Sequence, residues 1–204
     1  IYLITLLVVS ILLSILIVKN FSSNFLINTI LISSAFYLFF ITLRDFFSKG
    51  FKNLAQNTAH FGFSLLILSI LFNNLLSTET ITNLKVGETF ENKKTKIIFD
   101  NISQKEEKNY KSIIAEFIIQ DSRGKIENLS PELRIYNQPN TVTSEADIKT
   151  TLLSDKFIVI NLLPNQQFFN VRYQVKPFML WIWISVILIS VGGLLSFAKK
   201  EYEK

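Results

Sequence analysis

Long apolar stretches dominate the beginning and the end of the chain, and a segment of different pattern separates the third stretch from the fourth. Each stretch is about as long as a helix must be to cross the hydrocarbon core of a membrane, and each carries almost no charge. We therefore expect four transmembrane helices, at residues 1–18, 25–43, 53–76 and 178–197.

The segment between the last two helices has the pattern of a β domain. Its apolar runs are short, rich in β-branched and aromatic residues, and bounded by turn-forming residues. Residues 145–153 fit either a short helix or an extended segment. About six strands of this length are typical of a small sandwich or open barrel. The predicted strands are residues 95–100, 112–120, 125–129, 132–136, 156–163 and 168–175.

The predicted fold class is an α-helical membrane protein with four transmembrane helices and a small all-β extracytoplasmic domain inserted between helices three and four. The predicted domains are residues 1–77 with three helices, residues 78–175 with the β domain, and residues 176–204 with the fourth helix and a basic tail. Composition agrees with this class, since 49% of the residues are hydrophobic. The chain has no cysteine, which excludes disulfides, thiol catalysis and cysteine-bound metals.

The net charge of +5 comes from residues beside the apolar stretches, because basic and acidic residues are equal in number between positions 78 and 175. Basic residues in such places orient helices and contact lipid headgroups, so no nucleic-acid partner is expected. The side opposite Lys19 and Lys176 carries Arg44, Lys49, Lys52, Lys199, Lys200 and Lys204. By the positive-inside rule that side faces the cytoplasm or its equivalent. The β domain then faces the bacterial periplasm or the mitochondrial intermembrane space.

His60 is the only histidine of the chain and lies near the start of the uncharged run at residues 59–76. Lipid offers polar side chains no partner, so its helix face is expected to meet protein, water or a cofactor. Helical spacing places on that face, together with His60, the side chains of Asn53, Gln56, Asn57 and Ser64.

Two interpretations of His60 stay open on these grounds. An imidazole within a membrane helix binds a metal or haem iron or relays protons, and it also hydrogen-bonds neighbouring helices. The small residues Ala59 and Gly62 beside it leave room for a flat macrocycle or for another helix.

Two polar candidates lie in the predicted β domain. Arg134 and Tyr136 share one face of a predicted strand, where they would bind an anion or, as we expect, join a surface ion pair. The charged residues 105–111 are expected to form a solvated loop. No residue is assigned a catalytic role, since one histidine and no cysteine leave no nucleophile–base pair.

The start of the fourth apolar stretch carries Trp181 and Trp183, which we interpret as interfacial anchors. Near its other end, Gly192 and Gly193 are expected to allow close helix packing rather than chemistry.

The third apolar stretch resembles the "LAHLG"-type helix of the CcmF haem-lyase subunits of cytochrome c maturation, through residues 54–62 (LAQNTAHFG). The "PEKRxY" stretch of that family is similar to residues 131–136 (PELRIY), and its "TEAAI…DLYV" stretch is similar to residues 143–148 followed by 155–159. The family's closing helix is similar to the residues around Lys176-Pro177-Phe178 and the two tryptophans. The first two apolar stretches match only in hydropathy and position.

This resemblance implies a multi-span inner-membrane protein that takes haem from a haem chaperone and helps to attach it to the CXXCH cysteines of apocytochrome c. For His60 it implies the role of axial ligand to the iron of a b-type haem within the membrane, a haem proposed to keep the delivered iron reduced. His60 is therefore the expected cofactor-binding and metal-binding residue.

Other parts of the family pattern have no match in this sequence: the tryptophan-rich external segment, the paired external histidines and the second transmembrane ligand. They are expected in an upstream part of the same protein, so the second haem ligand should lie outside this chain. Ile1 as the first residue and Met179 as the single methionine agree with that expectation. The chain would then be a fragment or the product of a split gene.

We therefore expect the C-terminal portion of a haem lyase, not catalytic by itself, in a bacterial inner membrane or alternatively a mitochondrial one. Its expected partners are membrane lipid, the haem chaperone involved in haem transport, apocytochrome c and other maturation subunits. The alternative is a non-catalytic membrane scaffold that docks partners through its β domain. A transporter or proton relay would need several intramembrane ionisable residues, whereas only His60 lies within a predicted span.

Overall fold

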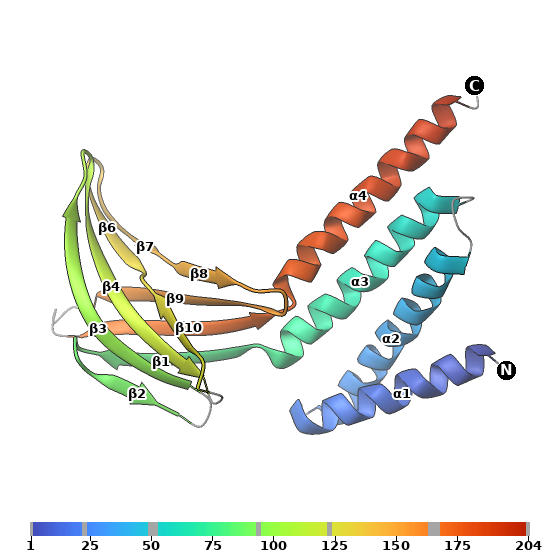
Figure 1. Cartoon of the computed structure of the whole chain (residues 1–204), viewed down its shortest axis with the longest axis horizontal. Helices are drawn as coiled ribbons and strands as arrows, with labels where there is room; N and C mark the ends of the chain where they lie inside the picture. The colour runs from blue at the N-terminus through green and yellow to red at the C-terminus, as the bar shows by residue number, and fades with distance from the viewer. Residues whose placement is uncertain are drawn as a thin grey trace. The chain divides into compact units, whose positions relative to one another are not determined.

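The structure, a computed structural model, divides into a helical unit and a β unit (Figure 1). It describes residues 2–21, 24–48, 53–92, 95–121, 124–162 and 168–202. Lys49, Lys52 and Lys204, which contribute to the predicted orientation, lie outside the described residues. The helical unit also includes residues Leu152–Ser154 and the segment from Lys176 onward.

In the described part of the chain the helical unit contains four long helices: α1 (Tyr2–Phe21), α2 (Phe25–Ser48), α3 (Leu54–Leu76) and α4 (Met179–Tyr202). By length and composition all four can cross a membrane, which confirms the predicted multi-pass membrane class. α2 continues to Ser48, beyond the predicted end at residue 43. The reason is that hydrogen bonding of the helical backbone does not stop where the side chains become polar.

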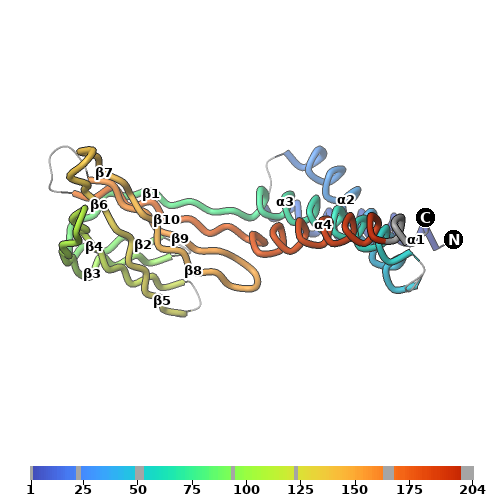
Figure 2. The backbone as a smooth tube through the Cα atoms, turned by 90° about the horizontal axis from the view of Figure 1, so that it is seen from above, coloured from blue at the N-terminus to red at the C-terminus, as the bar shows by residue number. Residues whose placement is uncertain are grey.

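Helices α3 and α4 run side by side and approach each other closely (Figures 1 and 2). A Cβ atom on Gly192 would lie 2.6 Å from the backbone nitrogen of Ala59, and one on Gly62 would lie 2.9 Å from Cβ of Leu188. Gly193 differs, because a Cβ there would meet nothing within 4 Å. Of the two glycines predicted to allow helix packing, the structure therefore assigns that role to Gly192.

The β unit is built from two sheets. One has the strand order β1-β10-β9-β8, and the other has the order β2-β3-β4-β6-β7 with β5 added against β4. β1 with β10, β3 with β4 and β6 with β7 pair in antiparallel registers. The strands are β1 (Thr78–Leu84), β2 (Thr89–Glu91), β3 (Thr95–Glu106), β4 (Tyr110–Asp121), β5 (Ile126–Leu129), β6 (Glu132–Asn137), β7 (Asn140–Glu145), β8 (Asp147–Thr150), β9 (Ser154–Leu162) and β10 (Phe169–Pro177).

The core of the β unit lies between these sheets and is filled from both. Over residues 97–100 of β3 and 115–120 of β4, buried residues alternate with partly or fully exposed ones, as expected when one face of a sheet is covered. Phe99 and Phe117 stack at a centroid distance of 4.4 Å in the middle of this core. The buried cluster consists of Leu84, Ile97, Phe99, Ala115, Phe117, Ile119, Leu129, Leu133, Ile158, Ile160, Val171 and Tyr173.

All six predicted strands are present, as β3, β4, β5, β6, β9 and β10, and the predicted small all-β domain between the third and fourth helices is confirmed. Residue 163, the predicted end of one strand, lies outside the described residues. Four strands were not predicted: β1, β2, β7 and β8. β1 (TETITNL) and β7 (NTVTSE) carry few apolar residues, and they form strands because neighbouring strands satisfy their backbone groups. Residues 145–153 proved extended rather than helical, with β8 at their centre.

A buried ion pair lies in the β unit beside this core. The carboxylate of Glu127, whose side chain is only 2% exposed, accepts a hydrogen bond from Nζ of Lys156 at 2.7 Å and pairs with Nζ of Lys125 at 2.8 Å. Burial on its own would raise the pKa of Glu127, but the two lysines outweigh burial and hold that pKa below its ordinary value. Burial and the negative charge of Glu127 together raise the pKa of the Tyr173 hydroxyl.

Gly192→Ala is expected to lower the stability of the helical unit by about 1–3 kcal/mol, because its methyl group would overlap the backbone of α3. Gly193→Ala is the matched control, and it should be neutral or slightly stabilising because alanine favours helix formation. Melting temperatures of the detergent-purified proteins measure both. Equal effects of the two substitutions would contradict the assigned packing.

Glu127→Gln is expected to destabilise the β unit by about 3 kcal/mol at pH 7, because Lys156, whose side chain is only 14% exposed, loses its counter-charge. Glu91→Gln removes an exposed pair with Lys96 and should cost under about 1 kcal/mol. Denaturant unfolding followed by circular dichroism gives both values.

The deficit of Glu127→Gln should also depend on pH. Because the pKa of Glu127 is lowered by folding, its contribution is complete above its ordinary pKa of 4.5 and is lost as the pH falls through the lower folded value. The difference between wild type and variant should therefore shrink below pH 4.5. A deficit that stays constant with pH would contradict the role of the charge.

Candidate functional site

His60 lies in the second turn of α3, about 9 Å along the helix axis from its first residue. Its side chain is exposed. Within the described ranges it makes no hydrogen bond or ion pair with another residue. Among those residues, the packing interpretation of His60 therefore has no hydrogen-bonding partner to support it.

The predicted polar face of α3 divides into a paired half and an open half. Nδ2 of Asn57 donates to the backbone oxygen of Asp45 at 3.2 Å, and the hydroxyls of Ser64 and Thr42 lie 2.6 Å apart. Asn57 and Ser64 are buried, and both of these contacts reach α2. The open half carries the exposed side chains of Asn53, Gln56 and His60. The paired half of the polar face thus holds α2 and α3 together, and His60 belongs to the open half.

The small residues near His60 serve helix packing rather than access to its ring. Gly62 lies against Leu188 of α4, and the backbone of Ala59 lies under Gly192. The sequence left two uses open for the space beside these small residues, a macrocycle or another helix. The structure shows that another helix occupies it. On the open side, the next exposed side chain one turn along α3 is Phe63, which is 54% exposed.

The residues around His60 fit one axial position of a haem. A neutral imidazole is sufficient to bind one axial site of haem iron, and an exposed phenylalanine one turn away is an apolar surface of the kind that a porphyrin contacts. No group of three or more histidine, cysteine, aspartate or glutamate side chains suitable for a metal ion occurs among the described residues. Among those residues, His60 is therefore a single nitrogen donor and not part of a chelating group.

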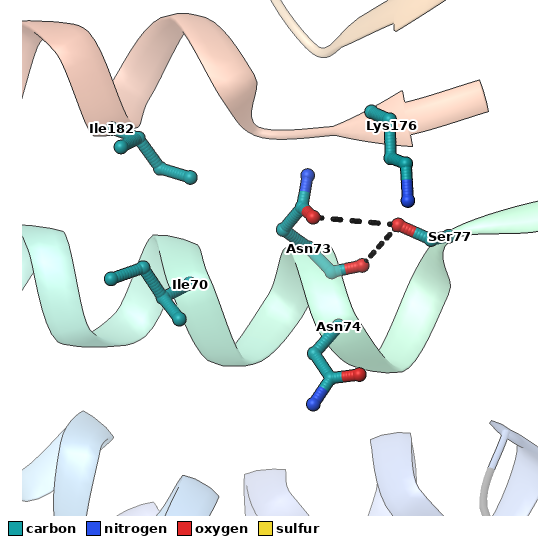
Figure 3. A pocket seen from close by; sticks show the side chains of 6 residues that line it. All are labelled: Ile70, Asn73, Asn74, Ser77, Lys176 and Ile182. Atoms are coloured by element: carbon teal, nitrogen blue, oxygen red, sulfur yellow. Dashed lines mark hydrogen bonds between the residues drawn. The ribbon is translucent and has the colours of Figure 1, made fainter. Parts of the chain in front are cut away.

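A second polar site, which the sequence analysis did not identify, lies where α3 ends and α4 begins (Figure 3). It is a pocket of about 340 Å³ within the helical unit. Two consecutive asparagines, Asn73 and Asn74, near the end of a predicted membrane helix are the sequence signal that could have located it. The lining residues are Ile70, Asn73, Asn74, Ser77, Lys176 and Ile182.

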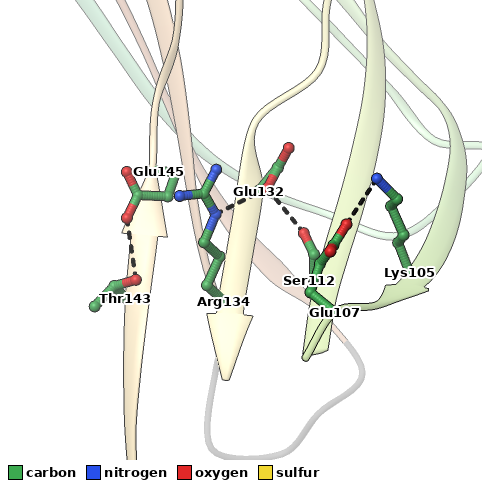
Figure 4. A network of polar contacts seen from close by, with 7 residues as sticks. All are labelled: Lys105, Glu107, Ser112, Glu132, Arg134, Thr143 and Glu145. Atoms are coloured by element: carbon green, nitrogen blue, oxygen red, sulfur yellow. Dashed lines mark hydrogen bonds and ion pairs between the residues drawn. The ribbon is translucent and has the colours of Figure 1, made fainter. Parts of the chain in front are cut away.

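Arg134 is engaged in a polar network of the β unit (Figure 4). Its Nε donates to Oε2 of Glu132 at 3.0 Å, and the same carboxylate oxygen accepts a hydrogen bond from Ser112 at 2.9 Å. The guanidinium also lies 5.2 Å from the ring centroid of Tyr110. Burial would raise the pKa of Glu132, but the hydrogen bonds from Ser112 and Arg134 hold it below its ordinary value. The expected ion pair of Arg134 is thus confirmed.

The predicted solvated loop at residues 105–111 is shorter in the structure, because β3 continues to Glu106 and β4 begins at Tyr110, which leaves only residues 107–109 between the strands. Lys105 pairs with Glu107 at 2.8 Å and Lys111 pairs with Glu106 at 3.4 Å, and all of these side chains except that of Glu107 are largely exposed. Such pairs contribute little to stability and have no arrangement that would support chemistry.

The two tryptophans of α4 have different surroundings. Nε1 of Trp181 donates to the backbone oxygen of Leu152 at 2.9 Å, so this ring fixes the segment Leu152–Ser154 to the start of α4. Trp183 is 61% exposed, as an interfacial anchor would be.

The arrangement defines a class: a multi-pass membrane protein with a two-sheet β unit inserted before its last helix. The sequence model of the family described as "CcmF C-terminal beta-sandwich" matches residues 75–177, about half of the chain. The chain therefore belongs to the CcmF family.

Curated relatives agree with this assignment. The chain is 26% identical over 172 residues to the "Cytochrome c-type biogenesis protein CcmF" of Pseudomonas aeruginosa, which covers 78% of this chain and 26% of the relative. It is 28% identical over 144 residues to the "Cytochrome c-type biogenesis protein ccl1" of Rhodobacter capsulatus, covering 71% of this chain and 22% of the relative. The chain thus spans about a quarter of the length of the curated relatives that it matches.

A solved structure named "Cytochrome c Heme Lyase CcmF" has the same fold. It superimposes with a TM-score of 0.67 at 17% sequence identity, over 94% of this chain and 33% of that chain. The arrangement of helices and sheets is therefore shared with a known haem lyase structure.

Asn57→Leu is expected to destabilise the helical unit by about 1–2 kcal/mol, because the backbone oxygen of Asp45 loses the Asn57 donor. Gln56→Leu places the same side chain at the exposed neighbouring position and should change stability by less than about 0.5 kcal/mol. Melting temperatures in detergent, followed by tryptophan fluorescence, compare the two. An equal loss in both variants would show that the hydrogen bond does not matter.

Proposed function

We propose that this chain is the C-terminal part of a membrane haem lyase that attaches haem covalently to apocytochrome c. Within it, His60 supplies one axial ligand to an intramembrane b-type haem. The single observation that carries the proposal is the state of His60: an exposed imidazole on a helix of spanning length, without a hydrogen-bonding partner among the described residues. An intramembrane ionisable side chain in that state is expected to have a functional partner.

The ligand role follows from the chemistry of the imidazole. In its neutral form one ring nitrogen offers a lone pair to iron while the other carries a proton that a neighbouring group can accept. A haem bound in this way supplies one-electron redox chemistry. α3 positions the ring rigidly, because Asn57 and Ser64 attach this helix to α2 and Gly62 fits it against α4. The second axial ligand would come from outside this chain, whose only histidine is His60.

The β unit is proposed to face the periplasm of a bacterial inner membrane. The support is the basic charge at the cytoplasmic ends of α2 and α4, where Arg44 and the C-terminal lysines lie in the sequence. In that orientation the β unit takes part in receiving the haem chaperone, apocytochrome c and other maturation subunits. A mitochondrial inner membrane, with the β unit in the intermembrane space, is the alternative location.

The second candidate function is a non-catalytic scaffold, and the use of Gly62 and Ala59 for helix packing favours it. In that case the helical unit is an assembly element, the β unit docks partner subunits, and His60 has no ligand. A scaffold tolerates His60→Gln, whereas an axial ligand does not.

His60→Ala is expected to abolish most of the b-type haem absorbance of the purified assembly, because a bound haem would lose the ligand that His60 supplies. Cytochrome c maturation in cells should fall with it. Gln56→Ala, one helical turn away on the same exposed side of α3, is the matched control and should retain both signals. The reduced-minus-oxidised spectrum and the yield of a reporter cytochrome c measure the two effects.

Rescue separates a missing ligand from a damaged fold. His60→Gly should regain haem absorbance when imidazole is added to the purified assembly, since the free ligand fills the vacated position. Unchanged haem content in His60→Ala would refute the ligand role and favour the scaffold.

A further inference from the structure

The pocket at the junction of α3 and α4 combines a polar end with an apolar end (Figure 3). Asn73 and Asn74 lie in the last turn of α3, Ser77 directly follows that helix, and Lys176 precedes α4 by three residues. Ile70 and Ile182 lie about one turn further into their helices, roughly 5 Å deeper. A ligand that fits here has a polar head and an apolar body.

The depth of the pocket matches the boundary between hydrocarbon and headgroups. Both helices have the length and composition of membrane spans, so their adjoining ends fall at that boundary. The polar lining residues lie at the helix ends, where the lipid headgroups are, and the two isoleucines lie deeper, where the hydrocarbon is.

The polar end of the pocket is held in place by hydrogen bonds at the end of α3 and in the segment just before α4. Nδ2 of Asn73 donates to the backbone oxygen of Pro177 at 2.6 Å, and the hydroxyl of Ser77 donates to the backbone oxygen of Asn73. The amide of Phe178 donates to Leu153 at 2.9 Å, which fixes the start of α4. These hydrogen bonds therefore fix the shape of the pocket beside Lys176.

Lys176 is the charged group left to bind a ligand. Lys176 is half-buried, and among the residues that the structure describes it has no acidic partner. Asn74 also lines the pocket, but its side chain points to the other side of α3, away from Lys176 (Figure 3). An ammonium without a counter-charge favours an anion, and acidic lipid headgroups at a membrane surface attract lysine side chains.

We propose that this pocket binds the phosphate headgroup of an anionic phospholipid. Lys176 pairs with the phosphate, and the acyl chains follow Ile70 and Ile182 along the helices. The lipid compensates the charge of Lys176 where the end of α3 lies beside the start of α4. Free inorganic phosphate has the same charged group but lacks the apolar body.

The experiment measures the melting temperature of the detergent-purified full assembly during titration with phosphatidylglycerol, phosphatidylcholine or inorganic phosphate. Phosphatidylglycerol should stabilise the wild type in a saturable way, and the other two should stabilise it much less. Lys176→Gln should weaken the response to phosphatidylglycerol about fivefold. Lys176→Met, which keeps the apolar stem, should weaken it as much, and Lys176→Arg should keep most of it.

Lys19→Gln is the matched control, because Lys19 lies in the last turn of α1 and does not line the pocket. It should respond to phosphatidylglycerol as the wild type does.

Equal losses in Lys19→Gln and Lys176→Gln would mean general surface attraction and would overturn the proposal. An equal effect of inorganic phosphate would mean a soluble-anion site and would overturn it too, as would an unchanged response of Lys176→Gln. None of these outcomes depends on the haem content of the assembly, so the proposed function is tested separately.

Discussion

The close approach of α3 and α4 is the constraint on which the rest of this protein depends. A methyl group on Gly192 would come within 2.6 Å of the backbone of α3, so the two helices lie together only because that position has no side chain. Their adjoining ends are then joined by the hydrogen bond from Asn73 to Pro177. The chain leaves one helix into β1 and returns from β10, and these two strands pair from Thr78 and Val175 onward. The β unit is thus inserted at a point where both of its connections start next to each other.

The same constraint explains why His60 is accessible. A helix that packs against two neighbours buries two sides, and α3 uses one for α2, through Asn57 and Ser64, and one for α4, through Gly62. The remaining side carries Gln56, His60 and Phe63. A histidine on either packed side would have been enclosed by this chain, whereas His60 is presented to whatever lies beside the helical unit. Rigid support together with an open ring is the combination that a ligand-bearing side chain needs.

Charged groups in the two units have different environments. In the β unit, Glu127 and Glu132 are compensated by lysine, arginine and serine donors, which lower their pKa values in spite of burial. In the helical unit, Lys176 is half-buried and has no such partner among the described residues. The first arrangement stabilises a fold, and the second is expected where the missing charge comes from the surroundings, which for a membrane protein include lipid headgroups.

Several features followed from the sequence by itself. Four uncharged apolar stretches, each long enough to cross a membrane, predict membrane helices, because a single segment satisfies all its backbone groups within lipid only as a helix. The apolar strands β3, β4, β9 and β10 were predictable for a similar reason, since their side chains alone carry the signal of a covered sheet face. His60 could be singled out because an ionisable group in such a helix is costly without a partner.

Other features were decided only by tertiary structure, because periodicity describes one element at a time and not its neighbours. Asn57 and His60 share a predicted face, but contact with α2 buries one and leaves the other open. Gly192 and Gly193 are identical in sequence terms, yet only one faces α3. The polar strands β1 and β7 exist because neighbouring strands accept their hydrogen bonds, and the pocket at Lys176 exists because residues far apart in sequence meet at two helix ends. In each case the deciding quantity is a contact between elements, which no local pattern contains.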